Sequence, residues 1–480
     1  MSAPTLETPS SAIAGGTASQ TPPAADALPS FQQPTGEAAV AGRRLPRQPV
    51  RVVVLGAGFG GLTFCQNLTH GDPSITLVDR QNHHLFQPLL YQIATAALSA
   101  ADIAQPTRNI LRNQYNVTVL LEQVQDFDLA NRKVVCTNET LEYDFLVLAL
   151  GAVTSYFGHP EWEKFAPGLK TIDDALAIRR RLLVAFERAE TMMDRDEQKR
   201  LLTMVLIGGG PTGVELAGAF SELANHVLDR DFRRIDPKSA RIILIEGSPH
   251  LLTAYTEDLR ESARRQLEGF GVEVMLNTRV KEVRQGEVEL VGGEVIHAET
   301  IIWAAGVAAN PLTRKLGLPP DALDRAGRIK VNPDLSLPGH PDVFAIGDLA
   351  LITDPDTGQP VPGVSPAAMQ MGKYVARLIT DDIDARQINA GGRKPFNYWD
   401  KGTMATIGRK AAVAMVGKLH FSGFIAWLAW LFVHVFFLIG FRNKVAAVAN
   451  WAYSYFTYKR SARLITGMPM IVVSDKVVPK

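Results

Sequence analysis

The chain has 480 residues, enough for about two to four domains that each bury a core. Hydrophobic residues make up 46% and charged residues 21%, close to globular averages, which excludes a polytopic membrane protein. The formal net charge of +1 hides an asymmetry, because Lys401 and the residues after it include 11 lysines and arginines but one acid, Asp475.

The N-terminal segment, residues 1–48, is rich in Pro, Ala, Ser, Thr and Gln and poor in aromatic residues. Such a segment cannot bury enough apolar surface to offset the entropy of ordering, so we expect a disordered tail. It has no basic region followed by an apolar one, which argues against a secretory signal. The two cysteines, Cys65 and Cys136, form no CxxC or zinc-ligand pattern, and we expect Cys65 to be a buried thiol.

A dinucleotide-binding motif follows the tail. Residues 50–55 predict a β-strand, and Gly56, Gly58 and Gly61 then fit GxGxxG at the start of a helix. The first glycine makes the turn, the second lets a pyrophosphate approach, and the third lets helix and strand pack closely. The helix N-terminus favours the phosphate charge. The next strand ends at Asp79, at the distance expected for an acid that accepts from a ribose hydroxyl.

The same pattern recurs after residue 200. A strand leads into Gly208, Gly210 and Gly213 at the start of a helix, and the following strand ends at Glu246. This acid lies farther downstream than usual because the segment NHVLDRDFRRIDPKS lengthens the connection. Two such units indicate two dinucleotides, or one dinucleotide and a decayed duplicate. The second unit keeps every expected residue, which favours two.

Three further strands end in residues typical of ligand-binding edges. The strand in YDFLVLALGA ends near Gly151, the one in TIIWAAGV ends near Gly306, and HPDVFAIGD places Asp348 after an apolar strand. An acid at the carboxyl end of a strand faces the ligand crevice in this architecture. The alternative for Asp348 is a helix N-cap.

Residues 418–444 hold the most unusual stretch, because no charged residue lies between Lys418 and Arg442. About 20 apolar residues would span a bilayer, but this stretch contains Ser422, two tryptophans and His434. The aromatic, basic-tipped segment that follows suits the headgroup layer. Three interpretations stay open: helices lying in one leaflet, a single span, and a helix buried in the protein. Trp427 and Trp430 would be interface anchors or would pack against the body of the protein.

Read in order, GAGFGGL, VDR, GGGPTGVELAG, WAAGV and FAIGD resemble the two-dinucleotide flavoprotein superfamily. NHHLFQPLLYQIATAALS, SPAAMQMGKYVARLI and DKGTMATIGR, with the late apolar stretch, resemble type II NADH dehydrogenases, the single-subunit NADH:quinone oxidoreductases. The resemblance implies an α/β fold with two Rossmann-like domains, the NAD domain inserted into a discontinuous FAD domain, plus C-terminal membrane-binding helices. The expected boundaries are 49–169 and 323–394 for the FAD domain, 170–322 for the NADH domain and 395–480 for the membrane-anchoring region.

The resemblance also assigns site residues. Tightly bound FAD would contact Gly56, Gly58, Gly61, Asp79, Gly151 and Asp348, and the substrate NADH would contact Gly208, Gly210, Gly213 and Glu246. Gly306 is a further expected cofactor-binding residue. Glu215 matches a glutamate close to flavin and nicotinamide, and the alternative is a glutamate that only favours a helix N-terminus. Gln370 and Lys401 match residues beside the isoalloxazine at the quinone site, where the lysine could stabilise a reduced, anionic flavin. A second family glutamine is replaced here by Pro366, which offers no side-chain amide.

The implied activity is electron transfer from NADH through FAD to a membrane quinone, without proton pumping. The alternative is a flavoprotein NAD(P)H reductase that serves a protein acceptor. Glu246 predicts a preference for NADH over NADPH unless an arginine such as Arg241 compensates. The expected partners are NADH, a membrane quinone and an anionic lipid bilayer, but no nucleic acid, and a homodimer is left open. The expected location is the cytoplasmic face of the inner membrane, monotopic or single-span through residues 419–458.

No metal is expected. The pair His83–His84 has no further His, Cys or carboxylate cluster beside it in the sequence. Hydrogen bonding near the flavin, or a structural role, is the favoured interpretation of this pair.

Overall fold

The computed structural model describes residues 43–46, 49–69, 73–389, 392–457, 460 and 462–465. Most of the expected N-terminal tail lies outside the described residues. Its last part makes ordered contacts before the expected boundary at residue 49. The Leu45 amide donates to the Arg386 carbonyl at 3.0 Å, and Arg43 donates to the Asp144 carbonyl at 3.0 Å.

The first sheet has six strands, five of them parallel. In spatial order they are β20 (Ser336–Leu337), β21 (His340–Ala345), β9 (Phe145–Leu148), β1 (Val50–Leu55), β2 (Pro73–Asp79) and β5 (Val117–Leu121). β21 pairs with β9 although almost 200 residues separate them, so the chain leaves this sheet and returns to complete it.

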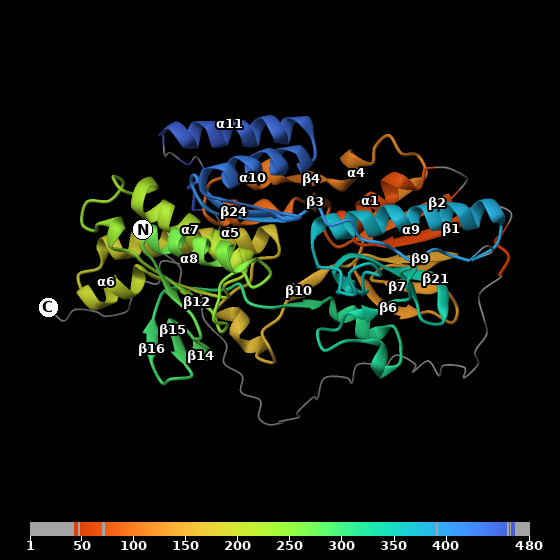
Figure 1. Ribbon diagram of the computed structural model, residues 1–480, viewed down its shortest axis with the longest axis horizontal. Helices are drawn as coiled ribbons and strands as arrows, with labels where there is room; N and C mark the ends of the chain where they lie inside the picture. Colours follow the sequence, from red (N-terminus) through yellow and green to blue (C-terminus); the bar gives the residue numbers. More distant parts are fainter. Residues whose placement is uncertain are drawn as a thin grey trace, which may run out of the picture. The chain divides into compact units, whose positions relative to one another are not determined.

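Both faces of the first sheet are covered, as a parallel sheet requires. Val52 and Val54 of β1 face one core cluster, while Val53 and Leu55 face another, because successive strand side chains alternate between faces. Helices α1 (Phe59–Asn67) and α9 (Ser365–Ala385) pack together on the first face (Figure 1). The antiparallel strands β6 (Val124–Asp128), β7 (Lys133–Cys136) and β8 (Thr140–Glu142) cover the second. Cys65 is buried in the first cluster, as predicted, and Cys136 in the second.

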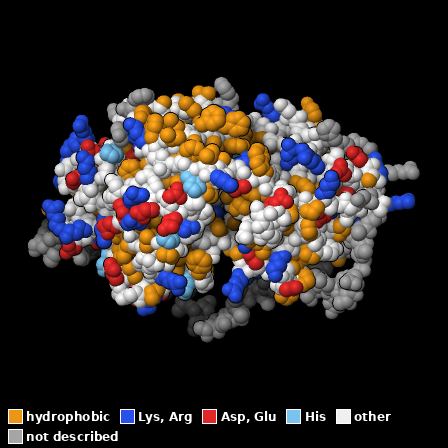
Figure 2. Space-filling view, viewed as in Figure 1, with side chains coloured by type: hydrophobic (Ala, Val, Ile, Leu, Met, Phe, Trp, Pro, Cys, Tyr) orange, Lys and Arg blue, Asp and Glu red, His pale blue; other side chains and the backbone are white. Residues whose placement is uncertain are grey.

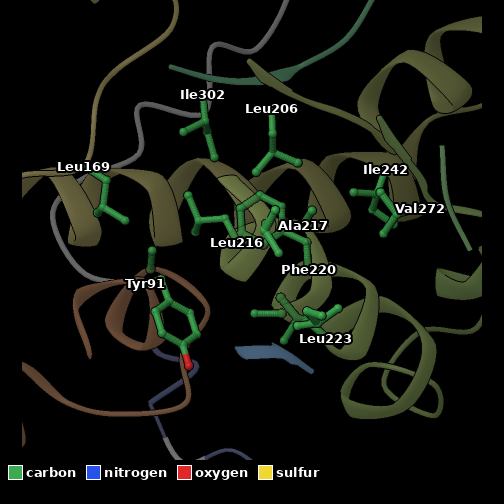
Figure 3. Packing of buried hydrophobic residues seen from close by; sticks show 14 of the residues in the cluster. Tyr91, Leu169, Leu206, Leu216, Ala217, Phe220, Leu223, Ile242, Val272 and Ile302 are labelled. Carbon is green, nitrogen blue, oxygen red and sulfur yellow. The ribbon is translucent and has the colours of Figure 1, made fainter. Parts of the chain in front are cut away.

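The second sheet repeats this plan with four parallel strands, in the order β13 (Val272–Met275), β12 (Arg241–Ile245), β11 (Thr203–Ile207) and β17 (Thr300–Trp303). Helices α5 (Ile172–Thr191), α7 (Pro211–Glu222) and α8 (Glu257–Gly269) share the core on one face, where Leu206 and Ile302 meet Leu216 and Phe220 of α7 (Figure 3). The antiparallel strands β14 (Val280–Arg284), β15 (Glu287–Leu290) and β16 (Val295–His297) cover the other face.

Two short strands join the two folds. β10 (Ala152–Thr154) follows the last residues of β9, and β18 (Val307–Ala309) follows β17, and the two pair antiparallel. The second sheet thus lies in the sequence between β9 and β21 of the first sheet. This topology confirms the predicted α/β fold with two Rossmann-like units, one inserted into the other.

Short elements fill the connections. The helices are α2 (Leu90–Ala94), α3 (Ala100–Ile103), α4 (Thr107–Ile110) and α6 (Arg195–Leu201), with a π-helical turn at Leu223–Val227. The paired strands are β3 (His83–Leu85) with β4 (Ala104–Pro106), and β19 (Ile329–Lys330) with β22 (Ala350–Leu351). The 3₁₀ turns are Gln87–Leu89, Pro160–Lys164, Pro237–Ser239, Pro311–Lys315, Pro320–Ala322 and Gly347–Leu349.

The C-terminal region consists of an antiparallel sheet and two helices. Its strands are β23 (Thr403–Gly408), β24 (Ala411–Val416) and β25 (Leu419–Ser422), followed by α10 (Gly423–Phe437) and α11 (Phe441–Thr457). Ala426 of α10 packs against Ala412 and Ala414 of β24. Trp430 is 2% exposed and belongs to the large core cluster, so it packs against the body of the protein and is not an interface anchor.

The outer face of this region is apolar. Exposed large side chains on α10 and α11 are Phe424, Ile425, Leu428, Phe432, Phe436, Val445, Val448 and Tyr453. Figure 2 shows hydrophobic side chains gathered on the side of the molecule where α10 and α11 lie in Figure 1. Among the described residues, no helix combines the length and the apolar character needed to cross a membrane.

Candidate functional site

A cavity of about 1190 Å³ is lined by elements of both nucleotide folds and of the C-terminal region. It brings together eight of the predicted site residues and Pro366: Gly56, Gly58, Asp79, Gly151, Glu215, Asp348, Gln370 and Lys401. Six predicted residues are not among its lining: Gly61, Gly208, Gly210, Gly213, Glu246 and Gly306. Four of these six, Gly208, Gly210, Gly213 and Glu246, were predicted for NADH.

The first glycine motif has the geometry that a bound pyrophosphate requires. Gly56 has a φ of +102°, and a Cβ there would collide with the carbonyl of Ala149 at the end of β9. A Cβ at Gly61 would collide with the Gly56 carbonyl, so α1 can approach the turn only without a side chain. At Gly58, no atom lies within 4 Å of the position that a Cβ would occupy, which leaves its backbone open to the cavity. The loop therefore fits the phosphates of a dinucleotide at the start of α1.

Two side chains hold this glycine loop at Ala57. Asp79 at the end of β2 accepts from the Ala57 amide at 2.6 Å with one carboxylate oxygen and from the Gln81 amide at 2.7 Å with the other. His84 is buried, and its Nδ1 lies 2.9 Å from the Ala57 carbonyl oxygen. Burial lowers the pKa of His84, so the neutral imidazole donates from Nδ1 to that carbonyl. His84 thus supplies a structural hydrogen bond to the loop, whereas the Nδ1 of His83 lies 3.0 Å from the side-chain oxygen of Asn82.

The second glycine motif reproduces the first. Gly208 has a φ of +115°, a Cβ at Gly213 would collide with the Gly208 carbonyl, and Gly210 faces open space. Glu246 accepts from the Gly209 amide at 2.6 Å and from the Ser248 amide at 2.7 Å. Each of its oxygens accepts one of these bonds, and a carboxylate has further lone pairs for a ribose hydroxyl.

The glycines at the ends of β9 and β17 also lie at turns. Gly151 and Gly306 have φ values of +66° and +76°. A Cβ at Gly306 would meet the ring of Phe157, an exposed residue whose own φ is +51°. Phe157 could not be found from the sequence, because its place beside Gly306 depends on the pairing of β10 with β18.

Glu215 lies on α7, in its second turn, and lines the cavity. The macrodipole acts mainly within the first turn of a helix, so a role limited to the helix N-terminus does not account for this placement. Burial raises the pKa of Glu215 to about 8, and an interaction with the Thr406 backbone amide opposes the rise only in part. The carboxyl group is thus protonated at neutral pH and can donate a hydrogen bond into the cavity.

Asp348 lies inside the 3₁₀ turn Gly347–Leu349, directly after β21, and its side chain lines the cavity. The residue in the N-cap position of that turn is Ile346, and α9 is preceded by Val364, so Asp348 is not an N-cap. It lies at the carboxyl end of a parallel strand, the edge of the sheet where ligands bind in this architecture.

Gln370 and Lys401 are joined by a contact between α9 and the loop before β23. The Gln370 side chain donates to the Trp399 carbonyl at 2.9 Å and accepts from the Trp399 amide at 3.0 Å. The Lys401 ammonium lies 5.3 Å from the Trp399 ring centroid and 5.6 Å from that of Phe437 on α10. Both distances are within the range of cation–π attraction. Pro366 occupies the first turn of α9, where a missing N–H has no cost.

Sequence reasoning missed several residues of the cavity. His434 of α10 lines it, is buried, and has its Nδ1 2.7 Å from the Trp430 carbonyl. Burial lowers the pKa of His434 to about 4, so its imidazole is neutral. A single histidine in an otherwise apolar helix is a sequence feature that could have identified His434 as a candidate site residue. Tyr91, whose hydroxyl accepts from Gln92 at 2.8 Å, carried no such signal. Within the described part of the chain, no three His, Cys, Asp or Glu side chains are grouped as metal ligands.

Comparison with known proteins identifies the class that this fold and paired site define. Residues 50–372 match the family model of the pyridine nucleotide-disulphide oxidoreductases. The likeness does not extend to a redox disulphide, since the two cysteines are buried in separate clusters. Among solved structures, that of NDH2 from Plasmodium falciparum in complex with NADH has a TM-score of 0.79 and 22% identity, covering 86% of this chain and 100% of that one. This likeness shows the fold.

Two curated relatives narrow the class. The type II NADH:quinone oxidoreductase Ndh of Mycobacterium tuberculosis is 44% identical over 445 residues, covering 91% of this chain and 92% of its own length. NdhA, a second type II NADH:quinone oxidoreductase of that organism, is 46% identical over 426 residues, covering 87% and 89%. The chain belongs to the type II NADH:quinone oxidoreductase family.

Proposed function

We propose that the cavity holds FAD and that the protein transfers electrons from NADH to a membrane quinone. Electron transfer from NADH to quinone without proton pumping is the activity of its family. One observation supports the assignment most directly. A single cavity reaches from Gly58 and Asp79 to Glu215 on α7 and to Gln370 and Lys401 beside α10. A cofactor lying in it would face both the second nucleotide fold and the C-terminal helices.

FAD, when bound, accepts two electrons from NADH and passes them to quinone. The chain supplies binding and charge. Gly58 and the start of α1 are placed for the pyrophosphate, and Asp79 for the adenosine ribose. Asp348 is placed for the ribityl side. The protonated Glu215 can donate a hydrogen bond where the flavin and the nicotinamide would meet, while Gln370 and Lys401 serve the quinone side.

The second glycine motif supports NADH as the donor. Glu246 at the end of β12 would accept from the 2′-hydroxyl of NADH and repel the 2′-phosphate of NADPH. Arg241, at the other end of β12, is engaged by Glu273 through two bonds of 2.7 Å and does not offset that repulsion. We expect kcat/KM to be at least tenfold higher for NADH than for NADPH, and Glu246→Gln to narrow this ratio. Equal values in the wild type would contradict the assignment.

The apolar face of α10 and α11 supports attachment to a bilayer. Type II NADH dehydrogenases are membrane-associated. Exposed aromatic and aliphatic side chains on these helices would enter the lipid, while the surplus of lysine and arginine after residue 400 would attract anionic headgroups. We place the protein on the cytoplasmic face of the inner membrane, with the end of the cavity at Phe437 and His434 near the lipid. A homodimer is compatible with this arrangement.

The domain limits follow from the same proposal. Residues 49–169 and 323–394 would form the FAD-binding domain, and residues 170–322 the NADH-binding domain. Residues 395–480 would form the membrane-anchoring region, with residues 43–46 docked on the FAD domain.

An anaerobic stopped-flow experiment on the purified protein tests the function. NADH should bleach the visible absorbance of one FAD per chain, and a quinone should restore it. A one-electron protein acceptor should restore it much more slowly. Purified protein without flavin, or flavin that NADH bleaches and quinone does not reoxidise, would contradict the proposal.

A further inference from the structure

Lys170 is a lysine that lines the cavity and belongs to none of the motifs described above. Its side chain is half-buried, and its ammonium forms no hydrogen bond or ion pair with the residues that the structure describes. Most lysines near a protein surface keep their charge in water. A lysine turned into a cavity without a protein partner is therefore a place where a ligand can meet a positive charge.

The backbone around Lys170 is held on three sides. A Cβ at Gly168 would collide with the Thr154 hydroxyl of β10, so the chain passes close to that strand. Leu169 is 7% exposed and packs in the cluster that contains Leu216 of α7 and Tyr91 (Figure 3). The Lys170 amide donates to the Asp174 carboxylate at 3.0 Å, within the capping box that starts α5. The position of Lys170 is set by both nucleotide folds.

The charges around Lys170 favour an anionic partner. Burial lowers the pKa of Lys170, and the attraction of Asp348 opposes this without forming an ion pair. A cation partly removed from water is stabilised by a negative partner in the same site. Asp348 comes from the first fold, and the neighbouring Leu169 packs against α7, which carries Glu215. Lys170 therefore lies where the two folds share the cavity.

We propose that the Lys170 ammonium contacts the isoalloxazine ring of FAD and makes it easier to reduce, by stabilising the negative charge that the ring gains with two electrons from NADH. This deepens the proposed function and rests on it. Lys401 differs in its surroundings, since its ammonium lies over the rings of Trp399 and Phe437 beside α10. The two lysines would thus act on different steps, Lys170 on flavin potential and Lys401 on the quinone.

The test is the midpoint potential of the bound flavin, measured by spectroelectrochemistry on the full-length holoenzyme. Lys170→Met should lower the potential by about 30 mV or more, the equivalent of a tenfold change in the reduction equilibrium of a two-electron couple. Lys170→Arg, which keeps the charge, should stay close to the wild type. Lys315→Met is the matched control, because Lys315 also lines the cavity but already donates to the Gln125 carbonyl at 2.9 Å.

Each outcome decides the proposal. An unchanged potential in Lys170→Met with FAD still bound overturns it, and so does an equal shift in Lys315→Met. If Lys170→Met loses its flavin, Lys170→Gln, which keeps a hydrogen-bond donor, replaces it in the measurement. Loss of flavin from both variants overturns the proposal in favour of a binding role. A wild-type protein without FAD would instead refute the proposed function, so the two failures are distinguishable.

Discussion

Glu215 carries a proton at neutral pH because burial of its carboxyl group raises its pKa to about 8. A carboxyl group with a raised pKa binds its proton more tightly in the folded than in the unfolded protein. Its contribution to the free energy of unfolding is therefore complete below the unfolded pKa of about 4.5 and is lost as the pH rises towards 8. The protonated carboxyl group can donate a hydrogen bond. Its loss of the proton in alkaline solution makes the protein less stable there.

The first prediction follows from the direction in which stability changes with pH. Glu215→Gln removes the titration, so the variant should gain thermal stability over the wild type between about pH 5 and pH 8, with no further gain above. Melting temperatures of both proteins across that range measure the effect. Glu187→Gln, at an exposed site on α5, is the control and should show no such trend. A constant difference between wild type and Glu215→Gln at all pH values would contradict the assignment.

At the scale of elements, Gln370 ties α9 to the loop that carries Lys401. Both atoms of its side-chain amide are bonded to the Trp399 backbone, so removing them frees the loop. We expect Gln370→Ala to slow flavin reoxidation by quinone by up to about 30-fold, because two hydrogen bonds of about 1 kcal/mol each are lost. Flavin reduction by NADH should be unchanged.

Stopped-flow traces of the two half-reactions separate these effects. Gln370→Glu keeps the acceptor for the Trp399 amide and should fall between Gln370→Ala and the wild type. Slower flavin reduction by NADH with normal flavin reoxidation by quinone would contradict the assignment of Gln370 to the quinone half-reaction.

A second prediction at this scale concerns α10. Ile425, Phe432 and Phe436 are 65%, 74% and 63% exposed. Replacing all three by serine removes several kcal/mol of lipid burial, at about 1.5–3 kcal/mol for each side chain. The variant should float with anionic liposomes at least tenfold less and should keep NADH oxidation by a small soluble acceptor.

The control for this experiment is a double variant, Tyr115→Ser with Met193→Ser. These side chains are 99% and 85% exposed but lie outside the C-terminal helices. The control should float as the wild type does. Equal loss in both variants would show that general surface apolarity, and not α10, is responsible.

The sequence allowed some of these elements to be predicted and not others, for physical reasons. Gly56 and Gly208 were found because a positive φ is a local demand that selects glycine. The bonds between Gln370 and Trp399 span 29 positions in the sequence and depend on tertiary packing. Lys170 was missed because a lysine before a helix has no distinctive sequence pattern. Its place in the cavity depends on the packing of β10 and α7. The surroundings of Trp430 could not be predicted, because a tryptophan suits both a lipid interface and a protein core.

At the scale of the whole molecule, a buried ionic cluster joins the C-terminal region to the second nucleotide fold. Glu222, at the end of α7, pairs with Arg409 at 3.1 Å and with Arg460 at 3.2 Å. Arg460 also donates to the Thr95 carbonyl at 2.7 Å, and Arg409 donates to the carbonyls of Ser454 and Tyr455 at the end of α11. The cluster connects α7, the turn between β23 and β24, and α11.

Removing Glu222 from this cluster should be costly. Glu222→Ala removes the carboxylate with which both Arg409 and Arg460 pair, and breaking a buried pair costs about 3–5 kcal/mol. Denaturant unfolding of the variant should show a loss of about 3 kcal/mol. Asp196→Ala removes a pair whose side chains are 79% and 92% exposed, and it should change stability by less than about 1 kcal/mol. If Glu222→Ala lowers the free energy of unfolding by less than about 1 kcal/mol, the cluster does not stabilise the fold.

If the apolar face of α10 and α11 attaches the protein to a bilayer as proposed, it also determines how the activity scales with lipid. An enzyme attached by that face meets NADH from the water in three dimensions and quinone from the bilayer in two. The quinone concentration that it experiences is then a mole fraction of the lipid, not an amount per litre. Extra lipid at constant quinone dilutes the second substrate across the surface, so the turnover rate falls although every bulk concentration of enzyme and substrate is unchanged.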